Sequence, residues 1–188
     1  MAQAGKDNAR LQGGGAFRSG KAHLRVWFIA GMGFLADLLS KTWILKTLGD
    51  MESGYLREPI VIISDYLRLV TVLNPGAIWG VAAGKTIFLI SASLLGLVFL
   101  VWFFYTSRPD QWLIHSAIGM LIAGDLGNLY DRIFNDGKVV DFIDVNLHFR
   151  PANPWPLFNI ADILLCLGVG ILLLSVFAAQ KADHPKTE

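Results

Sequence analysis

The side chains of this 188-residue chain that are best suited to chemistry are aspartates set in apolar sequence. Asp141 lies within the apolar stretch 139–143, and Asp162 stands near the start of another apolar block. Two carboxyl groups close together in a poorly solvated site do not both ionise easily, so one serves as a base and the other as an acid. Such a pair can activate water for hydrolysis. Asp141 and Asp162 are therefore catalytic candidates, provided that the fold brings them together.

Other kinds of chemistry have less support. The four histidines show no metal-ligand spacing, and no serine has an obvious base partner. Cys166 is the only cysteine and lies in an apolar segment, which favours a buried apolar role. The formal net charge is +1, and no basic stripe interleaved with aromatic residues indicates nucleic-acid binding. We therefore expect no metal, no other cofactor and no nucleic-acid partner.

A second polar group lies on the first apolar block, where Asp37, Ser40 and Lys41 share one helix face. Ionisable residues inside membrane segments are costly and are functional candidates by default. An ion pair between Asp37 and Lys41 would lower the cost of burying either charge. Direct contact of this face with a substrate is the alternative.

Small and polar residues recur along one stripe of the third apolar block, namely Gly124, Gly127, Asn128 and Asp131. Small residues let another helix approach closely, and Asn128 can hydrogen-bond across such a contact. Because Arg132 follows Asp131 directly, we expect this acid to have a cation nearby and to be structural, with catalysis as the alternative. Asp125 lies beside the stripe and has no role that the sequence assigns.

The fourth apolar block carries a helix-start signal. Asn159 stands where an N-cap is expected, and Asp162 lies three residues later, in the first turn. An N-cap side chain accepts a hydrogen bond from a free amide, and the positive end of the helix dipole stabilises a negative charge. A capped helix start with a complementary charge is therefore the alternative to a catalytic role for Asp162.

Four apolar blocks must position these residues. The composition is 54% hydrophobic and only 16% charged, which is too apolar for an ordinary soluble domain. Each block is close to the ~20 residues that a helix needs to cross the hydrocarbon layer. The blocks are 24–45, 87–105, 112–130 and 157–179. We predict an all-α integral membrane protein with four transmembrane helices, in one domain over residues 24–180.

Basic residues set the expected orientation. They outnumber acids in the N-terminal tail, and the C-terminal tail carries two lysines. Because short cytoplasmic segments are enriched in Lys and Arg, we expect both tails, 1–23 and 181–188, to be cytoplasmic. Residues 1–23 are rich in Gly, Ala and charge, which predicts disorder. The connections 46–86 and 131–156 then lie on the outer face, where the chemistry is expected.

Both outer connections contain extended sequence. In the first, 60–63 and 66–73 are β-branched and aromatic runs, which predict a small antiparallel sheet on the outer surface between the first and second helices. A turn, Asn-Pro-Gly at 74–76, ends the second run. In the second connection, 139–144 is short and apolar and fits either an extended segment or an irregular helix end.

Together, the polar segments resemble the sequence boxes of lipoprotein signal peptidases, also called signal peptidase II or prolipoprotein signal peptidase. The resemblance covers roughly residues 24–180. Five segments match in order: Asp-Leu-Leu-Ser-Lys at 37–41, Asn-Pro-Gly-Ala at 74–77, Gly-Asp-Leu-Gly-Asn-Leu-Tyr-Asp-Arg at 124–132, Val-Val-Asp-Phe at 139–142 and Phe-Asn-Ile-Ala-Asp at 158–162. Leu38, Asp125 and Ile163 depart from the usual pattern, and Asp125 stands where a small residue is common.

The resemblance implies an aspartic endopeptidase of the bacterial cytoplasmic (inner) membrane. It would remove the signal peptide from diacylglyceryl-modified prolipoproteins, cutting on the N-terminal side of the lipidated cysteine, with Asp141 and Asp162 as the catalytic pair. Prolipoproteins and membrane lipid are the implied partners, and the cyclic peptide globomycin is the implied inhibitor. Residues implied to order the site or hold substrate are Asn74, Gly76, Ala77, Asn128, Arg132 and Asn159.

Two other classes fit parts of the pattern. A small proton-coupled transporter would also carry intramembrane acids, but a transport path needs polar residues through both halves of the bilayer. The acids of this chain gather toward the outer side. A noncatalytic membrane scaffold is the second class, and it leaves the paired acids unexplained.

Overall fold

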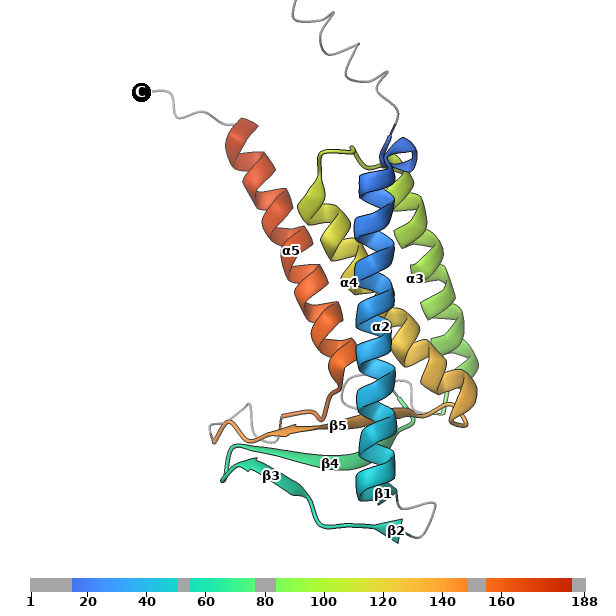
Figure 1. Cartoon of the computed structure of the whole chain (residues 1–188), viewed down its shortest axis with the longest axis vertical. Coiled ribbons are helices and arrows are strands. Elements are labelled where there is room, and N and C mark those ends of the chain that lie inside the picture. The colour runs from blue at the N-terminus through green and yellow to red at the C-terminus, as the bar shows by residue number, and fades with distance from the viewer. Residues whose placement is uncertain (1–14, 51–54, 77–83, 149–154, 184–188) are drawn as a thin grey trace, which may run out of the picture.

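The structure, a computed structural model, describes residues 15–50, 55–76, 84–148 and 155–183. In this part of the chain, four long helices run alongside one another, and strands cross one end of the bundle (Figure 1). The helical elements are η1 (Ala16–Arg18), α2 (Gly20–Leu48), α3 (Thr86–Thr106), α4 (Trp112–Phe134) and α5 (Ile160–Asp183). The strands are β1 (Gly49–Asp50), β2 (Tyr55–Leu56), β3 (Ile60–Ile63), β4 (Leu67–Asn74) and β5 (Val139–Val145).

Three of these helices are long and apolar enough to cross a membrane, namely α2, α3 and the Ile160–Ala178 part of α5. Their large apolar side chains point outward, and Leu24, Ile87, Leu95 and Leu174 are each at least 70% exposed. A soluble protein rarely exposes contiguous apolar surface on this scale. The outer surface of the bundle is therefore suited to lipid.

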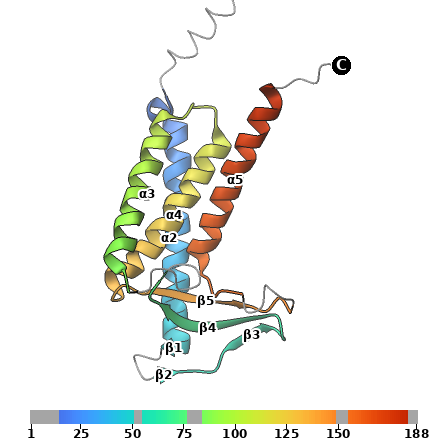
Figure 2. The same ribbon diagram turned by 180° about the vertical axis from the view of Figure 1, so that it is seen from behind.

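The fourth helix, α4, runs between the other three and packs against all of them (Figure 2). Its buried small residues, including Gly119, Ala123 and Gly124, allow this close packing. It also carries Asn128 and Asp131 of the predicted stripe, and it is not among the three described helices that are apolar enough to cross a membrane by length and composition alone. The four predicted segments are helical except for residues 157–159, since α5 begins at Ile160 and Phe158 instead bridges Ile143 of β5. The predicted membrane fold is confirmed.

The sheet differs from the prediction in its third strand. β4 lies between β3 and β5 and pairs antiparallel with both, so Leu69 is opposite Ile60 on one side and Ile143 on the other. We expected the sheet to belong to the first outer connection alone, but β5 comes from the second. Val139, Val140, Asp141 and Phe142 are all buried, so β5 lacks the alternation that marks a half-exposed strand. A separate pair, β1 with β2, forms a second small sheet.

The prediction that residues 1–23 are a disordered tail is wrong for residues 15–23, the part that the structure describes. Ala16 is fully buried, and its N–H donates to the Ser107 carbonyl at 2.9 Å. Ser19 caps α2 by accepting from Ala22 N–H at 3.3 Å, so the helix begins at Gly20 and not at residue 24. Contacts with the end of α3 therefore order residues 15–23, while residues 1–14 lie outside the described part. At the other terminus, α5 continues to Asp183, past the predicted boundary at 180.

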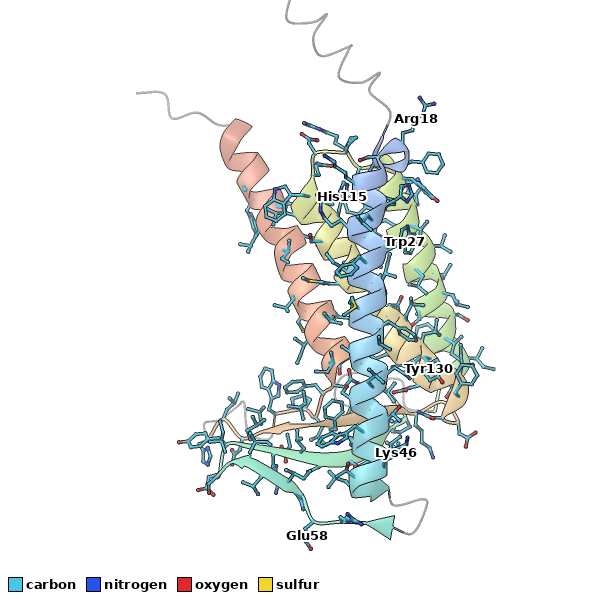
Figure 3. The ribbon with its side chains drawn as sticks, in the orientation of Figure 1. Arg18, Trp27, Lys46, Glu58, His115 and Tyr130 are labelled. Atoms are coloured by element: carbon cyan, nitrogen blue, oxygen red, sulfur yellow. The ribbon has the colours of Figure 1, made fainter. Side chains whose placement is uncertain are left out.

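The start of η1 and the end of α5 lie at one end of the bundle, and the sheet lies at the other (Figure 1). Figure 3 places Arg18 and His115 at the first end, and Lys46 and Glu58 at the second. The end of α2 is anchored to the sheet because Ile44 and Leu48 pack with Phe142. The described ends of the chain, η1 and the end of α5, thus lie at the same end of the bundle; that both termini are cytoplasmic stays a prediction.

α4 and α5 pack so closely at Gly124 that adding a single methyl group there should disturb the contact. A Cβ at Gly124 would lie 2.5 Å from the Ala161 carbonyl oxygen and 2.7 Å from Leu165 Cγ. We expect Gly124→Ala to lower the free energy of unfolding by about 1–3 kcal/mol, because the start of α5 must move. The measurement is unfolding in mixed detergent, followed by circular dichroism.

The matched control is Gly31→Ala, since nothing lies within 4 Å of a Cβ added at that exposed position of α2. This change should leave stability unchanged or raise it slightly, because alanine is the better helix former. Equal unfolding curves for the two variants would contradict the close packing of α4 on α5.

Candidate active site

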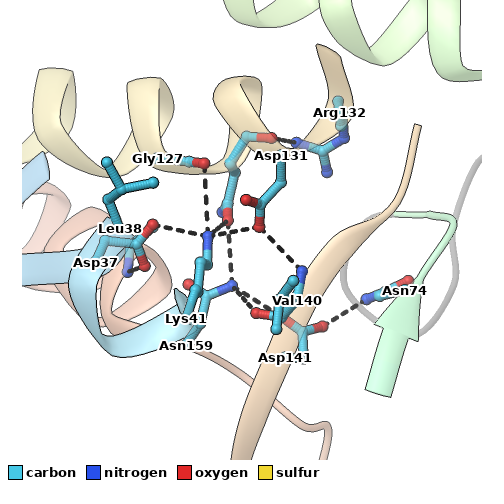
Figure 4. Close-up of polar contacts among 12 residues, drawn as sticks. Asp37, Leu38, Lys41, Asn74, Gly127, Asp131, Arg132, Val140, Asp141 and Asn159 are labelled. Carbon is cyan, nitrogen blue, oxygen red and sulfur yellow. Dashed lines mark hydrogen bonds and ion pairs between the residues drawn. The ribbon is translucent and has the colours of Figure 1, made fainter. Parts of the chain in front are cut away.

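The polar residues singled out in the sequence meet where the sheet joins the helix bundle (Figure 4). α2 contributes Asp37 and Lys41, and α4 contributes Asn128, Asp131 and Arg132. β4 ends with Asn74, β5 carries Asp141, and Asn159 and Asp162 stand at the start of α5. Segments more than a hundred residues apart therefore build a single polar cluster.

Asp141 is held between two amides. Asn74 Nδ2 donates to its Oδ2 at 2.8 Å, and Asn159 Nδ2 donates to its Oδ1 at 2.8 Å. The residue is 3% exposed. Burial raises the pKa of this carboxyl from its ordinary value of 3.8 to about 6; repulsion from Asp162 adds to the increase, and the Asn74 and Asn159 bonds oppose it. Asp141 is thus poised to hold a proton that an ordinary aspartate releases.

Asp162 belongs to a reciprocal cap at the start of α5. Its N–H donates to Asn159 Oδ1 at 3.0 Å, and Asn159 N–H donates back to Asp162 Oδ2 at 3.1 Å. This geometry confirms the predicted N-cap. The other carboxylate oxygen, Oδ1, accepts from Asn128 Nδ2 at 2.9 Å. Two amide donors and the positive end of the α5 dipole favour negative charge on Asp162.

Two amides connect the acids to each other. Asn159 Nδ2, which donates to Asp141, also lies 3.1 Å from Asn128 Oδ1, and the Asn128 amide nitrogen reaches Asp162. Asn159 is fully buried and Asn128 is 8% exposed. The expected hydrogen bond from Asn128 across the helix contact is therefore present, and it orients one of the candidate catalytic acids.

An ion triad lies beneath these amides. Lys41 Nζ is 2.7 Å from Asp37 Oδ2 and 2.9 Å from Asp131 Oδ2, and all three residues are at most 2% exposed. The intrahelical pair of Asp37 with Lys41 is confirmed. The expectation that Asp131 has a cation nearby is confirmed, but its ion-pair partner is Lys41 of α2 and not the adjacent Arg132, because consecutive helix residues point in different directions.

The triad also fixes the two segments that carry the candidate acids. Asp131 Oδ2 accepts from Val140 N–H at 3.0 Å, next to Asp141, and Asp37 Oδ1 accepts from Ala161 N–H at 2.9 Å, next to Asp162. Sequence analysis missed this positioning role, since backbone amides leave no signal in a motif. Ser40, the third polar residue of that α2 face, has no part in the triad, because its hydroxyl donates to the Asp37 backbone carbonyl at 2.8 Å.

Arg132 connects α4 to the turn after β4. Its Nη1 donates to the Asn128 carbonyl and its Nη2 to the Gly76 carbonyl, each at 3.2 Å. Gly76 N–H in turn donates to Asn74 Oδ1 at 2.9 Å, which orients the amide that contacts Asp141. Ala77, the remaining predicted site residue, lies outside the described residues.

Both candidate acids face one cavity of about 610 Å³, which we call the active-site cavity. Its other polar lining residues are Asn74, Ser93, Asp125, Asn128 and Arg132. Its apolar wall comes from the segment before α5 and from α5 itself, including Leu157, Phe158, Ile163 and Leu165. Asp37, Lys41 and Asp131 are not among the lining residues, so the geometry supports structural roles for them. The described residues contain no cluster of His, Cys, Asp and Glu that could hold a metal ion.

The pKa of Asp141 gives a prediction with two opposite arms. We expect its carboxyl to titrate near pH 6 in the resting protein. The titration is measured by NMR, from the chemical shift of the carboxyl carbon in isotope-labelled protein. Asp162→Asn should lower this midpoint by removing a repelling charge, and Asn74→Ala should raise it by removing a donor to the anion. Shifts of both variants in one direction would contradict the arrangement.

The same pKa has a consequence for stability. Between pH 3.8 and about 6, the folded protein keeps a proton on Asp141 that the unfolded chain has released. The contribution of Asp141 to stability therefore falls as the pH rises through this window.

Fold and site together define a membrane protein in which two acids accept hydrogen bonds from linked amides and face one cavity, an arrangement suited to hydrolysis. Comparison with known proteins makes the class specific. Residues 29–178 match the family model described as signal peptidase (SPase) II. The chain belongs to the signal peptidase II family, whose members are membrane proteases.

Relatives and solved structures agree with this membership. The chain is 36% identical to the lipoprotein signal peptidase of Clostridium acetobutylicum over 155 residues, covering 82% of this chain and 94% of the relative. It is 37% identical to that of Syntrophotalea carbinolica over 150 residues, covering 78% and 87%. A solved structure of a bacterial membrane enzyme superposes with a TM-score of 0.72 at 30% identity, covering 91% of this chain and 96% of the other.

Proposed function

We propose that this protein removes the signal peptide from lipoprotein precursors, cutting on the N-terminal side of a diacylglyceryl-modified cysteine, with Asp141 and Asp162 as its catalytic residues. The observation that carries the catalytic assignment is the linkage of the two acids. Each accepts an amide hydrogen bond, the amides contact each other, and both carboxyl groups face one cavity. The relatives named lipoprotein signal peptidase support the substrate class.

The two acids divide the chemistry by their surroundings. Asp162, held by amide donors at a helix N-terminus, is the base that takes a proton from water. Asp141, whose pKa is raised by burial, is the acid that hydrogen-bonds the scissile carbonyl oxygen. Water adds to the carbonyl carbon, the carbon–nitrogen bond then breaks, and the proton held by Asp162 goes to the leaving amine. The two protons belong to the pair as a unit because the acids interact.

The geometry of the bundle supports a site at the outer face of the bacterial cytoplasmic membrane. The acids lie at the sheet end of the helices, and the described chain ends lie at the other, where basic residues favour the cytoplasm (Figure 1). A signal helix and a lipidated cysteine both remain in the bilayer, so their junction reaches the acids where water still enters. The apolar α5 wall of the cavity suits such an apolar substrate.

The test is cleavage by purified protein in lipid nanodiscs. A diacylglyceryl-modified precursor should yield a product whose N-terminal residue is the modified cysteine, identified by mass spectrometry. The same precursor without the lipid should stay intact, and globomycin should block the reaction. Cleavage at another bond, or no preference for the lipidated precursor, would contradict the proposal.

A further inference from the structure

One acid in the active-site cavity has no part in the mechanism above. Asp125 lies on α4 three residues before Asn128 and seven before Arg132, so all three share one face of the helix. All three line the active-site cavity. At 1.5 Å of rise per residue, Asp125 lies about 4.5 Å deeper along α4 than Asn128, away from the sheet.

α3 holds this carboxyl in place. The Ser93 hydroxyl hydrogen-bonds the Asp125 side chain, and Gly96, one turn further along α3, packs against it. A Cβ on Gly96 would lie 3.3 Å from Asp125 Oδ2, so only a small residue leaves the carboxyl this room. Ser93 and Asp125 both line the cavity from facing helices.

Arg132 is not an ion-pair partner of Asp125. Its two terminal nitrogens donate to the carbonyls of Asn128 and Gly76, and among the described residues the Arg132 and Asp125 side chains attract each other without an ion-pair contact. The wall opposite is apolar, formed by Leu165, Cys166 and Leu167 of α5. A carboxyl and a hydroxyl in such surroundings gain most from a ligand that brings a hydrogen-bond donor.

We propose that Asp125 and Ser93 form a specificity subsite that binds a serine or threonine hydroxyl of the signal peptide shortly before the cut. This inference rests on the proposed function. The signal peptide comes from the membrane interior, so residues before the cut lie deeper than the acids, as Asp125 does. An extended peptide advances roughly 3.3 Å per residue, so a depth of about 4.5 Å places the recognised residue roughly one or two positions before the scissile bond.

The experiment measures kcat/KM on lipid-modified precursors that carry serine or alanine at either of these two positions. The wild-type protein should prefer serine over alanine at one of them by about tenfold, the effect of one buried hydrogen bond to a carboxyl group. Asp125→Ala should bring the ratio close to one, and Asp125→Asn, which keeps an acceptor oxygen, should retain part of it. Because the ratio compares two substrates on one preparation, partial loss of folded protein does not affect it.

Ser93→Ala tests the second member of the subsite and should reduce the ratio. Its matched control is Ser175→Ala on α5, whose hydroxyl bonds the Ile171 carbonyl of its own helix and which is absent from the cavity lining. This control should leave the ratio intact. Absence of a serine preference in the wild type, or an equal loss on both precursors in Asp125→Ala, would overturn the subsite. Failure of the wild type to cut any precursor would instead overturn the proposed function.

Discussion

Asp141→Asn and Asp162→Asn are each expected to reduce cleavage of a lipid-modified precursor by about 10²–10⁴-fold, the range for loss of a positioned general acid or base. An amide has the shape of a carboxyl group but neither takes a proton from water nor donates one to a leaving amine. Both substitutions keep an oxygen that can accept from the neighbouring amides, so we expect the fold to persist. Single-turnover cleavage with excess enzyme measures the chemical step itself.

Asp144→Asn is the matched control for Asp141→Asn. Asp144 lies on the same strand, three residues further on, and its partner is Arg68 on β4. It does not line the active-site cavity, so its loss should leave cleavage close to that of the wild type. Full activity of either Asp141→Asn or Asp162→Asn would refute the pair, and loss of activity confined to Asp131→Asn would move the chemistry to α4.

The choice between Asp131 and Asp141 shows how far sequence can go. Both are aspartates near the outer face, and the choice of Asp141 as the partner of Asp162 came chiefly from the family resemblance. In the structure, Asp131 is enclosed by Lys41 and the Val140 amide, whereas Asp141 faces the cavity. The enclosure of Asp131 depends on Lys41 of α2, and no local sequence pattern specifies where α2 lies relative to α4.

Local signals were reliable where the partners are near in sequence. The Asp37–Lys41 pair and the Asn159 cap each involve residues three or four positions apart, so helix geometry alone predicts them. β5 could not be assigned, because its residues are buried on both faces and alternation is lost. Its place beside β4 is set by pairing between outer connections separated by two helices, which is a tertiary event.

Lys41→Met is expected to lower the free energy of unfolding by about 3–5 kcal/mol, the cost of leaving buried charge without its partner. Lys41 is the shared cation of Asp37 and Asp131, and its loss leaves two carboxylates in a site that water does not reach. Lys46→Met, at an exposed position one turn later on α2, is the control and should change stability little. Detergent unfolding of both variants gives the comparison.

The loss of stability in Lys41→Met should come from the unpaired charges and not from altered packing. Adding Asp131→Asn to Lys41→Met removes one of the two stranded carboxylates, so we expect the double variant to regain part of the stability that the single variant loses. If the double variant is as unstable as the sum of its two single changes, the triad is not the coupled unit that the geometry indicates.

Lys41 should also affect catalysis in protein that stays folded. Lys41 Nζ and Asn159 Nδ2 both donate to Asn128 Oδ1, at 3.2 and 3.1 Å, so the Asn128 amide must turn its nitrogen toward Asp162. An amide has one acceptor end and one donor end, and two donors on the oxygen fix which is which. Without Lys41 that constraint weakens, and Asp162 loses a dependable donor. We therefore expect kcat to fall in Lys41→Met while KM changes little. An unchanged kcat in the folded fraction would show that Asn159 alone fixes the orientation of the Asn128 side-chain amide.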